Sequence, residues 1–578
     1  MRKITLFIIG ILFLLLNQLA FSKPVIQNIR AIKDSVGLFD KFEIQINMIA
    51  KYQNPFDPDE IDISTLFTSP SGKEWKINGF YNYNSWSSLW MVRFSPNETG
   101  IWKYQVNVKD QEDKIISETK IFTVLPSEYH GPVRISANNR YLEYEDGTPY
   151  YGVGLWYNDG YAKFNKGQIQ PEKLDHLKTL GVNFISSFMT PLETMGSGLG
   201  RYDQSLSGRL DEVLEMCEVR NMNLSLNIWF HAYLSETVWG GGNIRWKVNP
   251  YQLVCKAKDF YRSKDAWDYQ KKLYRYMIAR WGYSRALAIW FVVDEVNGTD
   301  GWVSGDSLGA AMWAKQVHDY FKTNDPYRHL TTGTRSGGFK EFWHEGYQVF
   351  DMASREIYEA QGYPINKEGR IDSSDKHPLI LSYRNYANEI EKLWNGYEKP
   401  AIIGETGWDH TFYEPSMPGY LALYHNALWV SLAKGTAMTP FWWAYSPYLN
   451  DNIVTNQITS FERFVSTVPF SKLTNLNPID VTLSNGDAFA IKSDQLVFGW
   501  VVNPKEDVTN AKVSVNSLID GKYNLKIYHT WRGAFIQETQ VSCKNGLVTF
   551  KLPELKIEGG HGKYLGQDAA FILIPIKK

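Results

Sequence analysis

The decapeptide ALAIWFVVDE, residues 286–295, joins a long apolar run to a pair of acids, Asp294 and Glu295. Such a run, rich in β-branched and aromatic residues, is typical of a strand that is buried on both faces. The segment PAIIGETGW, residues 400–408, repeats the pattern, because Glu405 follows directly after an apolar run. An acid at the end of a buried strand is costly to desolvate unless it has a partner or a function. The two segments therefore indicate a parallel sheet whose strand ends carry chemistry.

Six further apolar segments accompany these two, and stretches with helical periodicity separate them. The helical stretches at 171–180 and 266–281 place apolar side chains on one face. Strands that alternate with helices predict βα units, and eight such units predict a central (β/α)8 barrel over residues 132–470. The eight candidate strands are residues 150–157, 182–189, 223–231, 286–295, 329–334, 349–358, 400–405 and 439–445.

Shorter alternating strands flank this central block on both sides. Residues 23–126 alternate apolar and polar side chains with period two, and the turn segment PNETG at 96–100 interrupts them. Short strands over about 100 residues predict an immunoglobulin-like β-sandwich, which a linker at 127–131 joins to the barrel. Residues 471–578 return to the same pattern. The expected fold is therefore multidomain: a central (β/α)8 TIM barrel between an N-terminal and a C-terminal β-sandwich.

Residues 1–22 have the features of a signal peptide. Met1-Arg2-Lys3 is cationic, residues 4–16 are almost wholly apolar, and Ala20-Phe21-Ser22 has the small residues of a cleavage site. The apolar run is shorter than the ~20 residues that span a bilayer, which favours cleavage over the alternative, an uncleaved membrane anchor. We expect the mature protein to be secreted, periplasmic or on the cell surface, with no integral membrane span.

The composition restricts the classes of partner and cofactor. The chain of 578 residues has 61 Lys and Arg against 62 Asp and Glu, a formal net charge of −1. This balance gives no support to nucleic-acid binding. Aromatic residues make up 15% of the chain, with 21 Trp, which fits large cores or surfaces that hold sugars. Three Cys form no disulfide framework or metal-ligand pattern, and we expect no metal and no cofactor.

Acids at the ends of the fourth and seventh strands suit glycoside hydrolysis. That reaction needs one carboxylic acid to protonate the departing oxygen and a second carboxylate to act on the cationic sugar. Each acid taken alone has another explanation: favourable negative charge before a helix, or an ion pair with an Arg or Lys of the barrel. The matched positions of Glu295 and Glu405 favour the catalytic explanation.

Several motifs around these acids resemble those of a known family. The segment DGTPYYGVG at 146–154 is similar to the start of the first barrel strand in the clan A glycoside hydrolases, the retaining (β/α)8 glycosidases. Tyr358 matches the strand-six tyrosine of that clan, and Trp442-Trp443 matches the aromatic end of strand eight. The flanking β domains resemble those of exported bacterial proteins that degrade polysaccharides.

The resemblance implies roles for these residues. Glu405 would be the nucleophile, with the Tyr358 hydroxyl on one of its oxygens. Glu295 would be the acid/base, protonated at rest because burial and the nearby anion raise its pKa. Retention implies that the two carboxyl groups lie about 5–5.5 Å apart. The chain departs from the clan twice, because Asp294 stands where the clan has Asn and Glu356 where it has the His of His-x-Tyr.

Aromatic and imidazole side chains at or just after the strand ends are the candidates for sugar binding. Apolar sugar faces stack on aromatic rings, while neighbouring polar groups bind the hydroxyls. The alternative for each residue is a role in packing the mouth of the barrel. The candidate substrate-binding residues are Asp294, Trp156, Trp229, His231, Trp408, His410, Trp442 and Trp443.

Together these patterns predict an exported retaining glycoside hydrolase that cleaves β-glycosidic bonds of a poly- or oligosaccharide by double displacement. Glu405 is the expected nucleophile and Glu295 the expected acid/base. The alternative is a non-catalytic carbohydrate-binding or adhesion protein on a degenerate barrel, which the departures at Asp294 and Glu356 leave open. Nothing in the sequence indicates an oligomeric state.

Overall fold

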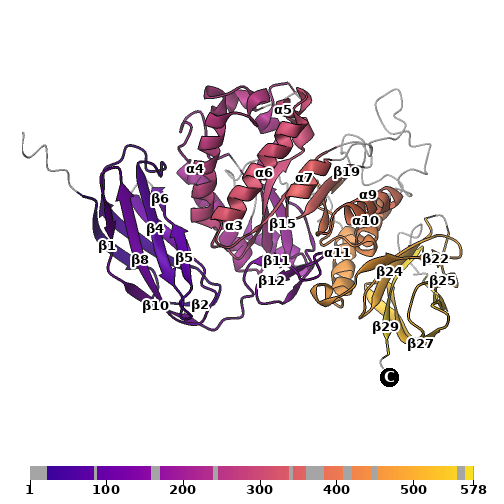
Figure 1. Ribbon diagram of the computed structural model, residues 1–578. Helices are drawn as coiled ribbons and strands as arrows, with labels where there is room; N and C mark the ends of the chain where they lie inside the picture. Colours follow the sequence, from indigo (N-terminus) through magenta and orange to yellow (C-terminus); the bar gives the residue numbers. More distant parts are fainter. Residues whose placement is uncertain are drawn as a thin grey trace, which may run out of the picture.

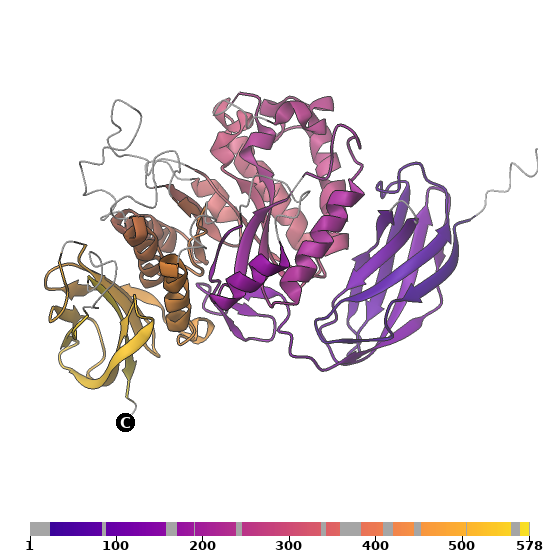
Figure 2. The ribbon, with the colours of Figure 1, turned by 180° about the vertical axis from the view of Figure 1, so that it is seen from behind.

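A computed structural model shows β-rich parts at the two ends of the molecule, with a mixed α/β part between them (Figures 1 and 2). The predicted signal peptide, residues 1–22, lies outside the described residues. The structure describes residues 23–83, 88–157, 170–189, 191–237, 245–336, 343–358, 383–407, 420–443, 452–504, 506–555 and 567–576.

The N-terminal part consists of two β-sheets. Its strands are β1 (Val25–Ala31), β2 (Ser35–Gly37), β3 (Phe42–Ile49), β4 (Ile61–Thr68), β5 (Glu74–Asn78), β6 (Phe80–Tyr83), β7 (Ser88–Phe94), β8 (Gly100–Asp110), β9 (Lys114–Ile116) and β10 (Lys120–Leu125). One sheet has the order β1-β3-β7-β6 and the other β2-β10-β8-β4-β5, with β9 paired to β8. Alternate residues of β8 are buried, as the period-two pattern predicts. They enter a hydrophobic cluster that includes Trp90 and Trp102.

The central part is built on parallel strands. They are β14 (Gly154–Trp156), β15 (Phe184–Phe188), β16 (Asn223–Phe230), β17 (Leu287–Asp294), β18 (Leu330–Gly333), β19 (Ala353–Tyr358) and β20 (Ala401–Gly407). The first five form one sheet in chain order, and β19 pairs with β20. Between the two sheets, Met352 N donates a backbone hydrogen bond of 3.2 Å to Thr331 O. A small antiparallel sheet of β11 (Val133–Ile135), β12 (Leu142–Tyr144) and β13 (Pro149–Tyr150) precedes β14.

The segment 437–443 connects the first and last of these strands. Met438 forms an isolated parallel bridge with Gly152, just before β14, and Trp442 forms another with Thr406 of β20. The described portion of the predicted eighth strand, 439–445, therefore contains one bridge, at Trp442, a second bridge lies one residue before it at Met438, and residues 444–445 lie outside the described residues.

Helices lie between consecutive parallel strands, as the sequence predicts. They are α2 (Pro171–Thr179), α3 (Gln204–Glu218), α4 (Lys264–Trp281), α5 (Asp300–Val303), α6 (Ser307–Asn324), α7 (His344–Val349), α9 (Tyr383–Gly396), α10 (Tyr420–Lys434) and α11 (Asn452–Val465). α2 begins with a proline and α4 is capped by Ser263, two common ways to start a helix. None of the described helices combines the length and the apolar character needed to cross a membrane.

The C-terminal part again consists of two sheets. Its strands are β21 (Asn477–Ile479), β22 (Val481–Leu483), β23 (Asp487–Lys492), β24 (Val497–Val502), β25 (Lys512–Val515), β26 (Gly521–His529), β27 (Ala534–Cys543), β28 (Val548–Lys551) and β29 (Asp568–Pro575). The larger sheet, β21-β23-β24-β29-β26-β27, packs on the central part, because Phe498 and Trp500 belong to the central hydrophobic cluster. Its other face and the sheet β22-β25-β28 share a separate cluster.

Buried polar contacts join the central part to its neighbours. Asp568 of β29 lies 2.8 Å from His425 Nε2 of α10, and both side chains are buried. On the N-terminal side, Arg93 of β7 reaches Asp211 of α3 at 2.7 Å, and Arg280 of α4 binds the same carboxylate. Removing one partner from such a buried pair is far more costly than the pair is stabilising, so these contacts fix how the parts dock.

Candidate active site

The acids predicted from the sequence lie at the carboxyl ends of the parallel strands. Asp294 is the last residue of β17, and Glu295 follows it in the left-handed region with φ 49° and ψ 54°. Its backbone N–H donates a hydrogen bond of 3.1 Å to Thr334 Oγ1, just after the neighbouring strand β18. A non-glycine residue rarely adopts this conformation, and examples cluster at functional sites.

Two further acids come from the pair of strands β19 and β20. Glu356 and Glu405 are register partners in this parallel pair, so their side chains lie at the same level. Carboxylate oxygens of Asp294, Glu356 and Glu405 all lie within 4.8 Å of one another. The three residues are only 2%, 2% and 5% exposed. Strands four, six and seven therefore bring three buried carboxyl groups to one point.

His231 completes a second group with the acids of β17. It follows β16, and its Nδ1 lies 2.8 Å from Glu295 Oε2. Burial lowers the pKa of His231, but the negative charge and hydrogen bond of Glu295 outweigh burial and raise it. His231 was a candidate sugar-binding residue, and the structure places it against the proposed acid/base.

The pKa of Glu295 shifts in the direction opposite to the one expected from the sequence. Burial raises its pKa, but the positive charge of His231 together with hydrogen bonds from His231, Ser336 and Glu356 outweighs burial, so the pKa lies below its usual range. Burial and then the charge of Glu295 instead raise the pKa of Asp294 to about 7. Burial and the charges of Asp294, Glu295 and Glu405 raise the pKa of Glu356 well above its usual range. The proton that the sequence assigned to Glu295 is therefore expected on the neighbouring pair of Asp294 and Glu356.

Two of the candidate sugar-binding tryptophans belong to the packed interior. Trp156 is fully buried, and its Nε1 donates to Gly404 O at 2.9 Å. Trp229 is 3% exposed, and its Nε1 donates to Tyr274 OH of α4 at 2.8 Å. Neither ring has a free face for a sugar. The prediction that these two residues bind substrate is therefore wrong, and both rings pack in the interior below the strand ends. A strand-end position in the sequence does not distinguish an inward-packed ring from an exposed one.

The remaining candidates are placed only in part. Trp442 and Trp443 are buried, and Trp443 meets Trp156 edge to face at 5.8 Å between ring centroids. Tyr358 is the last residue of β19 and pairs with Gly407 of β20, but its side chain lies outside the described part of the structure. Trp408 and His410 lie outside the described residues altogether.

Thr334 is a site residue that the sequence analysis missed. Its Oγ1 donates a short hydrogen bond to Glu356 Oε1 and lies 3.4 Å from Asp294 Oδ1. The signal that could have found it is its position, because Thr334 directly follows β18 just as Glu295 directly follows β17. Gly404 on β20 makes room nearby, since a Cβ there would lie 2.2 Å from Ser354 Oγ and 2.6 Å from Thr334 Cγ2.

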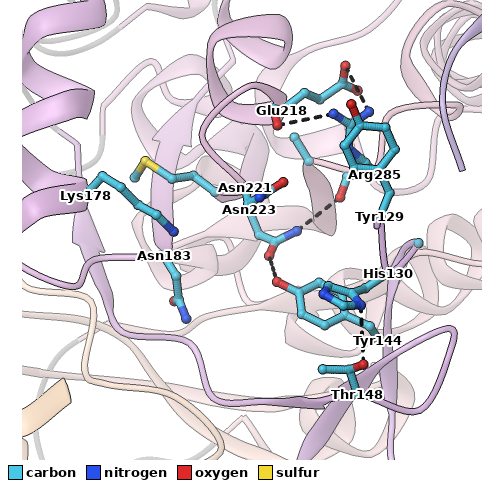
Figure 3. A pocket seen from close by; sticks show the side chains of 13 residues that line it. Tyr129, His130, Tyr144, Thr148, Lys178, Asn183, Glu218, Asn221, Asn223 and Arg285 are labelled. Atoms are coloured by element: carbon cyan, nitrogen blue, oxygen red, sulfur yellow. Dashed lines mark hydrogen bonds and ion pairs between the residues drawn. The ribbon is translucent and has the colours of Figure 1, made fainter. Parts of the chain in front are cut away.

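A pocket of about 250 Å³ lies at the opposite ends of the strands (Figure 3). Asn223, the first residue of β16, accepts from Tyr144 OH at 3.0 Å and donates to Arg285 O at 3.1 Å. Arg285 covers the Tyr129 ring, 3.8 Å from its centroid, and lies 3.8 Å from Glu218. In this pocket Asn223 binds Tyr144 and Arg285 lies against Glu218, whereas the acids at the carboxyl ends crowd together, so the carboxyl ends are the candidate active site.

Comparisons with known proteins show the fold. A family model described as a domain of unknown function, DUF5060, matches residues 35–109. The curated proteins contain no match. A solved structure from Bacteroides vulgatus ATCC 8482, described provisionally as a glycoside hydrolase, is 16% identical with a TM-score of 0.61, covering 94% of this chain and 100% of that one. The two chains share a fold.

Two further solved structures are less similar to this chain. A glycoside hydrolase family 5 protein from Bacteroides vulgatus ATCC 8482 is 14% identical with a TM-score of 0.48, covering 77% of this chain and 94% of that one. The exo-β-1,4-mannosidase Op5Man5 from Opitutaceae bacterium strain TAV5 is 12% identical with a TM-score of 0.44, covering 59% of this chain and 64% of that one. At these identities and TM-scores the likenesses say nothing of the sugar that this chain would take.

Proposed function

We propose that the chain is an exported retaining glycoside hydrolase that cleaves β-glycosidic bonds of a poly- or oligosaccharide. The observation that carries the proposal is the gathering of Asp294, Glu356 and Glu405 within 4.8 Å at the carboxyl ends of strands four, six and seven. Glu295 is linked to this group through Asp294, with which it and His231 form a second group of side chains within 4.8 Å. We also infer that the parallel strands close into a (β/α)8 barrel, between an immunoglobulin-like sandwich at 23–126 and a second sandwich at 471–578. The bridges of segment 437–443 support this closure.

In the proposed reaction Glu405 attacks the anomeric carbon while Glu295 gives a proton to the departing oxygen. Water then hydrolyses the glycosyl-enzyme after Glu295 has taken one of its protons. The contact of 2.8 Å between His231 and Glu295 holds one proton in the resting site. As negative charge develops on the departing oxygen, that proton passes from His231 Nδ1 through Glu295, so the lowered pKa of Glu295 is compatible with acid catalysis.

Nucleophile trapping tests the proposal. The full mature chain is incubated with activated 2-fluoro-glycosides of several sugar configurations, and intact mass is measured. We expect one covalent adduct, mapped to Glu405, that is absent from Glu405→Gln. The matched control is Glu193→Gln. Glu193 is buried but does not belong to the cluster of acids at the strand ends, so this variant should still be labelled at Glu405.

The alternative function has a different signature. A non-catalytic carbohydrate-binding protein would bind saccharides in calorimetry, but it would give no adduct and no hydrolysis product with any sugar. Hydrolysis that persists in both Glu295→Gln and Glu405→Gln would contradict the assignment of these residues.

A further inference from the structure

The two oxygens of Glu356 have different surroundings. Oε1 accepts a hydrogen bond from Thr334 Oγ1. Oε2 is buried and has no hydrogen-bond donor, and one carboxyl oxygen each of Glu356, Asp294 and Glu405 lie within 4.8 Å of one another. A buried carboxylate oxygen that faces other carboxylates is strongly destabilised unless a proton lies between them.

The direction of the neighbouring hydrogen bonds fixes which oxygen carries that proton. Glu295 N–H donates to Thr334 Oγ1 at 3.1 Å, so the single hydroxyl proton of Thr334 is left to donate onward. It goes to Glu356 Oε1, because Asp294 Oδ1 is farther away at 3.4 Å. Oε1 therefore behaves as the carbonyl oxygen of a carboxylic acid, and Oε2 is the oxygen that bears the proton.

The charged groups around Glu356 come from every neighbouring strand. Acids predominate: Asp294 and Glu295 follow one another at the end of β17, and Glu405 lies on β20. The cations are His231 after β16, Arg335 after β18 and Arg355 on β19, and Tyr347 of α7 also lies nearby. His231 lies against Glu295 at 2.8 Å and Arg355 against Glu389 at 2.5 Å. Arg335 Nη1 donates to Ser336 O at 3.1 Å.

We propose that Asp294 and Glu356 form a carboxyl pair that shares a proton, in which Glu356 is the neutral acid. Its Oε2–H donates to the Asp294 carboxylate, and its Oε1 holds Thr334. Glu356 is thereby a positioning residue, since Thr334 in turn holds the left-handed backbone of Glu295. The raised pKa of both acids agrees with this arrangement. Proton sharing stands without the proposed glycosidase function, whereas its effect on turnover rests on that function.

Unfolding of the full mature chain at different pH values tests the pair without a substrate. A carboxyl group that stays protonated in the fold makes the folded protein bind more protons than the unfolded chain, so stability falls as pH rises. Glutamine keeps the shape of the neutral acid, with an N–H for Asp294 and a carbonyl for Thr334. Between pH 5 and pH 8 we expect the melting temperature of Glu356→Gln to fall less steeply than that of the wild type. The exposed control Glu398→Gln should follow the wild type.

A second variant and a second readout complete the test. Asp294→Asn removes the other half of the pair and should flatten the same pH dependence, which covers the case in which Glu356→Gln does not fold. If the chain is a glycosidase, Glu356→Gln should keep kcat/KM within about tenfold of the wild type, while Glu356→Ala should lose about 100-fold or more. Absence of hydrolysis by the wild type as well as by every variant would count against the glycosidase function and leave the unfolding result intact.

Three results would overturn the pair. In the first, Glu356→Gln and Asp294→Asn have the same pH slope as the wild type. In the second, Glu356→Gln is destabilised equally at every pH, which would mean that Glu356 is ionised in the fold. In the third, EDTA lowers the melting temperature of the wild type and Ca²⁺ restores it, which would mean that a cation and not a proton lies between the acids.

Discussion

Replacing Asp294 with Asn should remove a large part of the pH dependence of stability. The Asp294 carboxyl is 2% exposed, and its pKa rises from 3.8 in the unfolded chain to about 7 in the fold. Because the folded form, in which Asp294 is coupled to Glu356, keeps its protons to higher pH than the unfolded chain, the stabilisation is fully present below pH 3.8 and is lost as the pH rises to 7. Each pH unit in this window changes the free energy of unfolding by about 1.4 kcal/mol, so the coupled titration of Asp294 and Glu356 that the variant removes accounts for up to about 4 kcal/mol.

The assay is denaturant unfolding of wild type and Asp294→Asn, followed by tryptophan fluorescence at pH 4 and pH 7. Fluorescence is suitable because Trp156, Trp229 and Trp290 are buried in the central part and report on its unfolding. We expect the free energy of unfolding of the wild type to fall more between the two pH values, by up to about 4 kcal/mol. Equal changes in the two proteins would refute the reasoning, because they would show that Asp294 titrates alike in the folded and unfolded chains.

Three further changes test other contacts of the site and its supports. Gly404→Ala should lower stability by about 1–3 kcal/mol and reduce turnover, because its Cβ would press on Ser354 and Thr334; an unchanged melting temperature and kcat would contradict this. His231→Gln should move the alkaline limb of the kcat/KM profile to lower pH, because the variant lacks the imidazole that shares the resting proton with Glu295; a limb that stays in place would show that this pair does not govern it. Asp568→Ala should destabilise the docking of the C-terminal part by about 3–5 kcal/mol, because His425, Trp500 and Trp531 all bind its carboxylate; limited proteolysis that cuts the variant no faster than the wild type would argue against it.

The main strands and helices could be predicted because they follow from the spacing of apolar residues along the chain. The apolar run that ends in Asp294 is β17, and the run before Glu405 is β20, as each run indicates. The helix predicted at 266–281 is α4, which begins two residues earlier. A strand buried on both faces must be apolar throughout, and a helix must have one apolar face, so the sequence carries these features directly.

The candidate sugar-binding residues show that the sequence pattern is insufficient to predict where a side chain points. Trp156 and Trp229 stand at strand ends, as an exposed aromatic subsite would, yet both rings are buried and their N–H groups are bonded. The direction of a side chain at the end of a strand depends on the twist of the sheet and on the helix that packs there. For Trp229 that helix is α4, which supplies Tyr274.

By itself the sequence determined the order of strands and helices and the positions of the acids at the strand ends. It also marked Asp294 and Glu356 as the two departures from the family that the chain resembles. Only the tertiary structure decided that these two acids meet each other, that Thr334 lies between them, and that His231 lowers the pKa of Glu295. The physical reason is that a proton's position depends on distances of a few ångströms between charges, and those distances are set by strands far apart in the chain.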